Sequence, residues 1–163
     1  MDPIRERWYR RKRELYAGGR PSSSGRFQNR VAARLFLAFR PLFGGRGVVL
    51  EVRGRSSGRT VRLPLVLLTA DAGRFLVSML GNDAGWVRNV LADEGRAVLR
   101  TGRRRELVRL DAVPVDRRAP LLKRYLAVAP GARPHIPVDR RAPVADFEAI
   151  AADYPVFRVV TRR

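Results

Sequence analysis

The sequence predicts a mainly β protein of the α+β class, in which an antiparallel sheet closes into a barrel. Apolar runs of strand length follow one another between residues 47 and 113, and turn residues separate them. Only one short helical pattern interrupts these runs, so the crossover helices of a parallel α/β sheet are missing. Several strands with few helical crossovers favour antiparallel pairing and closure into a barrel.

Six strands are expected along the chain. The apolar and alternating runs place them at residues 47–53, 61–69, 74–80, 96–101, 105–113 and 156–161. Asp71-Ala72-Gly73 has the composition of a tight hairpin turn between the second and third strands.

Short helices are expected around this sheet. Residues 84–92 carry apolar side chains at helical spacing, and residues 117–127 and 144–152 form two further helical patterns. The stretch between these last two patterns is rich in proline and is expected to be a loop.

The first 45 residues differ in character from the rest. Residues 3–17 have the pattern of a short basic helix, and residues 18–25 have the composition of a flexible linker. Phe27, Val31, Leu35 and Phe39 then recur at four-residue spacing, which predicts an amphipathic helix. We expect a helical extension at residues 1–45 and a barrel domain at residues 46–163. The aromatic face has three interpretations: packing on the barrel, lining an apolar substrate pocket, or lying on an anionic membrane surface.

The charge of the chain is strongly positive. Among 163 residues, 34 lysines and arginines against 15 acidic residues give a net charge of +19. Such a charge suits a nucleic acid, an anionic membrane surface or a polyanionic ligand. None of the common nucleic-acid motifs is recognisable, so no nucleic-acid partner is expected. No apolar run approaches the ~20 residues of a membrane-spanning helix, and the first eight residues lack the apolar core of a signal peptide. We expect a cytoplasmic protein, at most attached to the inner face of the membrane.

The inventory of reactive side chains is small. There is no cysteine and His135 is the only histidine, which excludes disulfides, thiolate chemistry and a multi-histidine metal site. No metal site is expected. A nucleophile elbow, a Walker phosphate loop and a Gly-x-Gly-x-x-Gly fingerprint are also missing. If the protein is an enzyme, a cofactor brings the reactivity.

The connection at residues 54–59 is the first candidate site. It joins two apolar runs, begins with Gly54, and contains Arg55, Ser56, Ser57, Gly58 and Arg59. Successive backbone N–H groups in such a turn favour anions, and arginine supplies bidentate donors for phosphate. The alternative is a β-hairpin turn that is merely polar and basic.

Weaker candidates lie further along the chain. Trp86 and Asn89 share one face of a short helix, behind a loop that can receive an anion. The alternative is a core tryptophan beside a surface or capping asparagine. His135 lies among prolines that fix an extended backbone, but a lone histidine is more often structural. Tyr125 and Tyr154 are able to donate a proton to a substrate, or belong to the core with the hydroxyl at its edge.

The order of these features resembles a known family. The run GRSSGRTVRLPL from Gly54 is followed by a hairpin, by the sequence from Gly81 to Trp86-Val87-Arg88-Asn89-Val90, and by a strand pair. This order is similar to that of the deazaflavin-dependent nitroreductases, also called F420H2-dependent quinone reductases, within the split β-barrel flavin-binding group. The resemblance covers residues 48–113, with a weaker echo at residues 154–157. It implies a six-stranded, FMN-binding-like split barrel.

The resemblance implies a cofactor and its contacts. The cofactor is coenzyme F420, an 8-hydroxy-5-deazaflavin that carries a phosphodiester and several carboxylates; FMN is the alternative. In the family, the turn and nearby basic residues hold the phosphate and the polyglutamate tail. By position, this role falls on Arg55, Ser56, Ser57, Gly58 and Arg59, with Arg62 as a helper. The deazaflavin ring would be bordered by Pro64, Leu65, Met79, Leu80, Gly81, Trp86 and Asn89. The family commonly has lysine where this chain has Ser56.

The activity that follows is hydride transfer from reduced coenzyme F420 to a quinone, a nitro compound or an activated alkene. His135, Phe147 and Tyr154 lie in the part of the chain expected to contact this small-molecule acceptor. A homodimer is expected from the fold group, and residues 1–45 are candidates for peripheral membrane contact. The alternative function is a non-catalytic flavin- or lipid-binding barrel at the membrane surface.

Overall fold

The computed structural model describes residues 45–162; the helices and linker expected at the N-terminus lie outside the described residues. In the described part, seven strands form one antiparallel sheet in the order β2-β1-β5-β6-β7-β4-β3. The strands are β1 (Gly47–Arg53), β2 (Thr60–Val66), β3 (Leu68–Ala70), β4 (Gly73–Val77), β5 (Arg96–Thr101), β6 (Arg104–Ala112) and β7 (Val156–Thr161).

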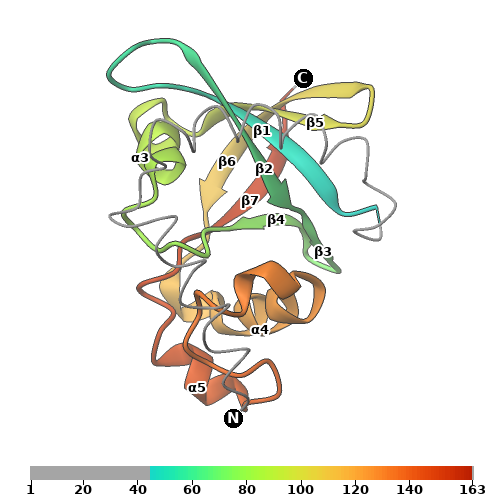
Figure 1. The fold of residues 1–163 in the computed structure, drawn as a ribbon, viewed down its shortest axis with the longest axis vertical. Helices are drawn as coiled ribbons and strands as arrows, with labels where there is room; N and C mark the ends of the chain where they lie inside the picture. The colour runs from blue at the N-terminus through green and yellow to red at the C-terminus, as the bar shows by residue number, and fades with distance from the viewer. Residues whose placement is uncertain (1–44, 163) are drawn as a thin grey trace.

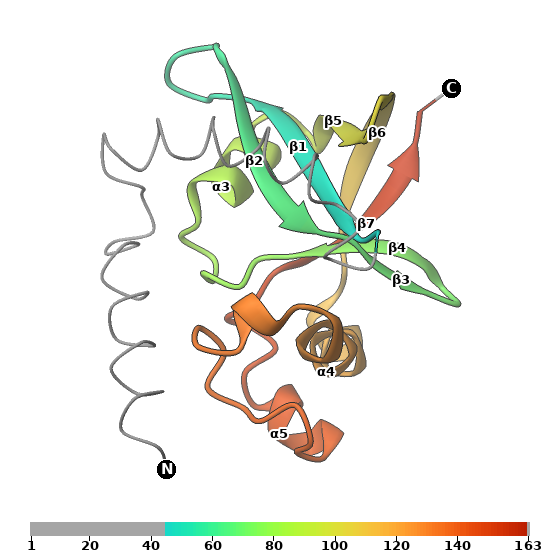
Figure 2. The same cartoon turned by 45° about the vertical axis from the view of Figure 1, so that its right-hand side comes forward.

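The sheet closes because its two end strands are consecutive in the chain. Leu67 alone separates β2, at one end of the order, from β3, at the other. The two form one bent strand whose first half pairs with β1 and whose second half pairs with β4, as Figure 2 shows. The seven strands are therefore the six expected ones with the second bent at Leu67, and the predicted split barrel is confirmed.

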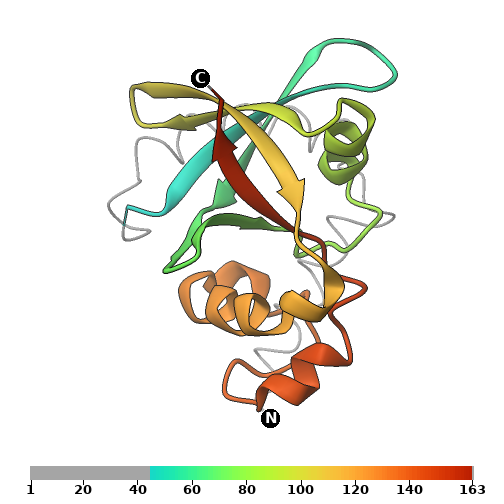
Figure 3. The ribbon, with the colours of Figure 1, turned by 180° about the vertical axis from the view of Figure 1, so that it is seen from behind.

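The barrel interior holds the first hydrophobic core. Alternate residues of β1, namely Val48, Leu50 and Val52, point inward because successive side chains of a strand face opposite sides. Helix α3 (Gly85–Ala92) packs against one end of the barrel (Figure 3). The centroid of the Trp86 ring lies 5.4 Å from that of the Phe157 ring.

A second core joins the barrel to the helices below it in Figure 1, which are α4 (Ala119–Val128) and α5 (Val144–Glu148). Two 3-10 turns, η3 (Val115–Arg117) and η4 (Pro130–Ala132), flank α4. Leu122 and Leu126 of α4 pack with Phe75 and Val77, which face outward from β4.

Two elements end three or more residues earlier than expected. The strand expected at 74–80 ends at Val77, because residues 78–81 form a turn in which Ser78 Oγ donates to the Gly81 carbonyl (2.8 Å). The helix expected at 144–152 ends at Glu148, and turns follow it.

An ion pair closes the polar end of the barrel interior. Glu106 is paired with Leu99 and Arg74 with Val159, so both charged side chains point inward. The Arg74 guanidinium donates two hydrogen bonds to Glu106, at 2.6 and 2.9 Å. This bidentate contact lowers the pKa of Glu106 to about 2.

Candidate functional site

The turn at residues 54–59 is closed by its own backbone. The Gly54 N–H donates to the Arg59 carbonyl (2.9 Å), and the Gly58 N–H donates to the Gly54 carbonyl (2.7 Å). Gly58 has a φ of +64°, in the left-handed region that favours glycine. A Cβ on Gly54 would lie 2.9 Å from Ser57 Oγ, which itself accepts from the Arg59 N–H (3.3 Å). The backbone angle therefore favours glycine at position 58, and the close approach of Ser57 and Arg59 favours it at position 54.

The turn is bound to helix α3 through one side chain. Asn89 Oδ1 accepts two hydrogen bonds from Arg55, from its backbone N–H (3.2 Å) and from Nη1 (3.0 Å). Asn89 is only 7% exposed, so it is neither a surface nor a capping residue. In Figures 1 and 3 the turn arches beside α3. Two site candidates separated by 34 positions in the sequence thus form one structure.

The turn carries positive charge with no acidic partner. Arg53, Arg55 and Arg59 form no ion pair with a carboxylate in the part of the chain that the structure describes. The Arg53 guanidinium lies over the turn, because a Cβ on Gly58 would be 3.8 Å from its Nη2. A polyanion would therefore meet three guanidinium groups here.

The backbone contributes fewer anion donors than the sequence suggested. The N–H groups of Gly54, Arg55, Gly58 and Arg59 all bind protein oxygens. Those of Ser56 and Ser57 form no hydrogen bond to the described residues. The guanidinium groups are consequently the main anion donors at this turn.

Strand β2 leads away from the turn, and within residues 45–162 it pairs with β1 alone. The Leu67 N–H donates to the Arg46 carbonyl (2.9 Å), so Leu67 and Arg46 form a hydrogen-bonded pair. In an antiparallel ladder, hydrogen-bonded and non-hydrogen-bonded pairs alternate along the two strands. By this alternation Pro64 is a non-hydrogen-bonded position, so its missing N–H removes no bond from the ladder. Pro64 and the adjacent Leu65 face opposite sides, and Leu65 packs into the barrel core. Their side chains therefore cannot contact the same ligand, and only the backbone of this stretch can present both residues to one ligand.

The loop after β4 is fixed to the segment that precedes β7. Asn82 Nδ2 donates to the Ala152 carbonyl (3.0 Å), and a Cβ on Gly81 would lie 3.2 Å from the Asp153 carbonyl oxygen. Met79 packs on the helical core and Leu80 on the barrel core. The loop expected to border the cofactor therefore spans the junction of the two cores.

The remaining candidates are placed less favourably for ligand contact. Trp86 is 8% exposed, and Phe147 is completely buried between the helices, where it packs and offers no surface to a ligand. Tyr154 donates its hydroxyl hydrogen to the His135 carbonyl (2.9 Å), which brings these two residues together. Burial and the nearby Asp153 raise the pKa of Tyr154 above its usual value. The fully buried Tyr125 belongs to the helical core.

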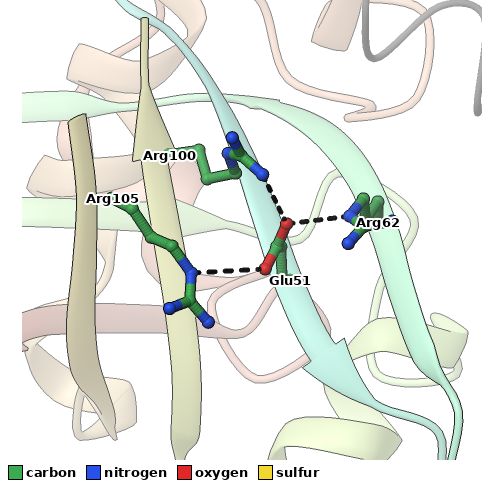
Figure 4. Close-up of polar contacts among 4 residues, drawn as sticks. All are labelled: Glu51, Arg62, Arg100 and Arg105. Atoms are coloured by element: carbon green, nitrogen blue, oxygen red, sulfur yellow. Dashed lines mark hydrogen bonds and ion pairs between the residues drawn. The ribbon is translucent and has the colours of Figure 1, made fainter. Parts of the chain in front are cut away.

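Two buried polar residues were missed in the sequence. Among the described residues, the buried polar or charged side chains are Glu51, Ser78 and Asn89. Ser78 fixes the loop after β4, and Glu51 binds arginines on β2, β5 and β6 (Figure 4). A lone acidic residue inside the apolar run 48–52 is the signal that would have identified Glu51.

Neither a metal site nor a membrane span is found in residues 45–162. No group of three histidine or acidic residues in this range is placed to hold a metal ion. No helix in this range combines the length and apolarity needed to cross a bilayer.

The curled antiparallel barrel is the fold of the FMN-binding split-barrel proteins. The family model described as F420H(2)-dependent quinone reductase matches residues 23–146, and the chain belongs to this family. No curated protein matches the sequence.

Several solved structures are similar to this chain at low sequence identity. A protein of unknown function from Agrobacterium tumefaciens is 17% identical with a TM-score of 0.53, covering 72% of this chain and 49% of its own. The chain thus spans about half the length of that protein. A putative pyridoxamine 5'-phosphate oxidase from Listeria innocua is 7% identical with a TM-score of 0.50, covering 79% and 94%. An F420-H2 dependent reductase is 20% identical with a TM-score of 0.45, covering 70% and 93%.

Coenzyme F420 is the cofactor of this family, and the residues of the site fit its anionic part. Its phosphodiester and carboxylates require several cationic donors, which Arg53, Arg55 and Arg59 supply without acidic competitors among the described residues. Asn89 holds Arg55 at this position.

Proposed function

We propose that the protein transfers hydride from reduced coenzyme F420 to a quinone, with nitro compounds and activated alkenes as further acceptors. The observation that carries this proposal is the junction of the basic turn with α3 through Arg55 and Asn89. When bound, the reduced deazaflavin supplies the hydride, so the protein's task is to position it and to exclude water.

Each part of the junction has a distinct role. Arg55 and Arg59 bind the phosphate and carboxylates, Ser56 and Ser57 add two N–H groups, and Asn89 orients Arg55. The backbone of β2 at Pro64 and the loop at Gly81 border the ring. Tyr154 and His135 are proposed to lie on the acceptor side. Membrane contact through residues 1–45 and a homodimer stay predictions.

Turnover tests the proposal. Purified protein is mixed with reduced coenzyme F420 and a soluble quinone, and reoxidation of the deazaflavin is followed by its absorbance. We expect turnover that requires the protein, and a higher KM for the cofactor in the Arg55→Ala variant. The Arg124→Ala variant removes one exposed charge from α4 and serves as the control. Tight cofactor binding without turnover of any acceptor would support the non-catalytic alternative.

A further inference from the structure

One short segment of the chain contacts three separate parts of the structure. Residues 150–155, here called the connector, run from α5 to β7 and so pass from the helices to the barrel (Figure 1). Near its start, the Ala151 carbonyl accepts from Arg118 Nη1 (3.2 Å), at the N-terminal end of α4. The rest of the connector contacts both the loop after β4 and the α4–α5 loop, residues 129–143.

The loop after β4 is bound to the connector at two points. The Ser78 N–H donates to the Pro155 carbonyl (2.9 Å). Asn82 Nδ2 donates to the Ala152 carbonyl (3.0 Å). Since this loop is proposed to border the deazaflavin at Gly81, the connector sets the position of the cofactor side of the site.

The α4–α5 loop is bound to the connector through the side chain of Tyr154. Its hydroxyl donates to the backbone carbonyl of His135 (2.9 Å). Elsewhere the loop is attached to α4, where Arg133 Nε donates to the Leu126 carbonyl (3.1 Å). Tyr154 therefore joins the α4–α5 loop to the same segment that holds the cofactor side.

The hydroxyl of Tyr154 can be separated from its ring by substitution. The ring packs against the helical core, and Tyr154→Phe keeps this packing while it removes the hydrogen bond. Burial and the nearby Asp153 raise the pKa of the hydroxyl, so it stays protonated at neutral pH and keeps the hydrogen that it donates. The substitution thus removes one neutral contact and leaves the charge of the site unchanged.

We propose that Tyr154 is a positioning residue for the hydride acceptor. This proposal rests on the proposed function. By its hydrogen bond to His135, Tyr154 holds the α4–α5 loop at a fixed place relative to the loop after β4, and the α4–α5 loop forms the wall against which the quinone binds. Hydride transfer requires the reacting atoms to lie close and aligned, so a displaced wall weakens productive binding of the acceptor. The Tyr154 hydroxyl itself takes no part in the chemistry.

The competing interpretation is that this hydrogen bond only stabilises the fold. A purely structural contact would lower the fraction of folded protein and so reduce the maximal rate, without changing the KM for either substrate. A positioning contact changes the KM for the acceptor and leaves binding of the cofactor as it is. Because KM does not depend on the fraction of active protein, the two interpretations are distinguishable even in a variant that is partly unfolded.

Two substitutions at the connector contacts and one control test the proposal in the full-length protein. Steady-state kinetics with reduced coenzyme F420 and a soluble quinone give the KM for the quinone, and titration with the oxidised coenzyme gives its Kd. The test variant is Tyr154→Phe. Asn82→Ala removes the side-chain contact on the cofactor side. The control is Tyr125→Phe, the same change on a fully buried tyrosine of the helical core.

Tyr154→Phe is expected to raise the KM for the quinone roughly three- to tenfold, the range set by the loss of one neutral hydrogen bond. The Kd for the coenzyme should stay within about twofold of the wild-type value. Asn82→Ala should show the reverse pattern, with the larger change in the Kd for the coenzyme. Tyr125→Phe should match the wild type in both quantities.

A KM for the quinone that is unchanged in Tyr154→Phe, or that rises equally in Tyr125→Phe, would overturn the positioning role. Parallel rises in the KM for the quinone and the Kd for the coenzyme in Tyr154→Phe would overturn it as well. A wild type that binds the coenzyme but turns over no quinone would instead contradict the proposed function on which this role rests.

Discussion

At the scale of single residues, the position of the basic turn depends on the side-chain amide of Asn89. Asn89 Oδ1 receives both hydrogen bonds that tie the turn to α3, and the side chain is almost fully buried. An amide oxygen suits this position because it accepts without adding a negative charge that would neutralise Arg55. The same residue thus sets the position of the turn and leaves the arginine charge available for an anion.

Two substitutions of Asn89 separate these effects. Asn89→Leu removes the acceptor, and we expect a loss of about 1 kcal/mol in the free energy of unfolding and weaker cofactor binding. Asn89→Asp keeps the acceptor but pairs Arg55 with a charge, so stability should be retained while affinity for the anionic cofactor falls. Urea unfolding and cofactor titration measure the two quantities. Equal affinity in the aspartate variant and the wild type would contradict this role.

Glu106 gives a prediction for the dependence of stability on pH. Its pKa is lowered to about 2 by the Arg74 contact, from an ordinary value near 4.5. The ion pair therefore stabilises the fold above the ordinary pKa, and this contribution is lost as the pH falls from about 4.5 towards 2. Because Arg74 is partly exposed, we expect roughly 1–2 kcal/mol at neutral pH. The difference in unfolding free energy between wild type and Glu106→Gln should shrink over this window.

The sequence predicted some residues of the site and missed others for identifiable reasons. Arg55 and Asn89 were both candidates, but their contact depends on how β1 and α3 meet, which local patterns do not encode. Glu51 lies inside the apolar run at residues 48–52, and the sequence alone does not show which side chains meet it. Its position opposite Arg62 becomes apparent only from the register of β1 and β2.

At the scale of elements, local patterns predicted most strands because period-two alternation and turn residues agree there. The bend at Leu67 was not predictable, since Leu67 lies inside an uninterrupted apolar run at residues 63–68. Strand β4 ends before the predicted residue 80 for a local reason. The Ser78 hydroxyl donates to the Gly81 carbonyl, so the chain turns although Met79 and Leu80 are apolar. Such competition between side-chain hydrogen bonds and the strand ladder is typical of serine.

The loop after β4 gives the prediction for this scale. Gly81 has a φ of +80° and faces the Asp153 carbonyl, so Gly81→Ala should destabilise the fold by about 1–2 kcal/mol. Gly85, at the start of α3, has no atom of residues 45–162 within 4 Å of its would-be Cβ, and Gly85→Ala should be neutral or slightly stabilising. Thermal unfolding of both variants is the measurement. Similar losses in both would show that the loop is not held as described.

At the scale of the whole molecule, charge and fold act together. A net charge of +19 attracts polyanions from a distance, but only positions without acidic partners hold them. Surface arginines such as Arg88 and Arg109 are paired with Asp83 and Asp111, whereas those of the turn have no such partner in residues 45–162. The barrel presents these arginines at the end of its β1–β2 ladder, beside α3.

The central claim is that the turn at residues 54–59 binds the anionic part of coenzyme F420. The most direct measurement is equilibrium titration of the wild type and of Arg55→Ala with Arg59→Ala, at low and high salt. We predict that the wild type binds, that its affinity falls as salt rises, and that the double variant loses both most of the affinity and most of the salt dependence. Binding that is equally tight and equally salt-dependent in the double variant would contradict the account.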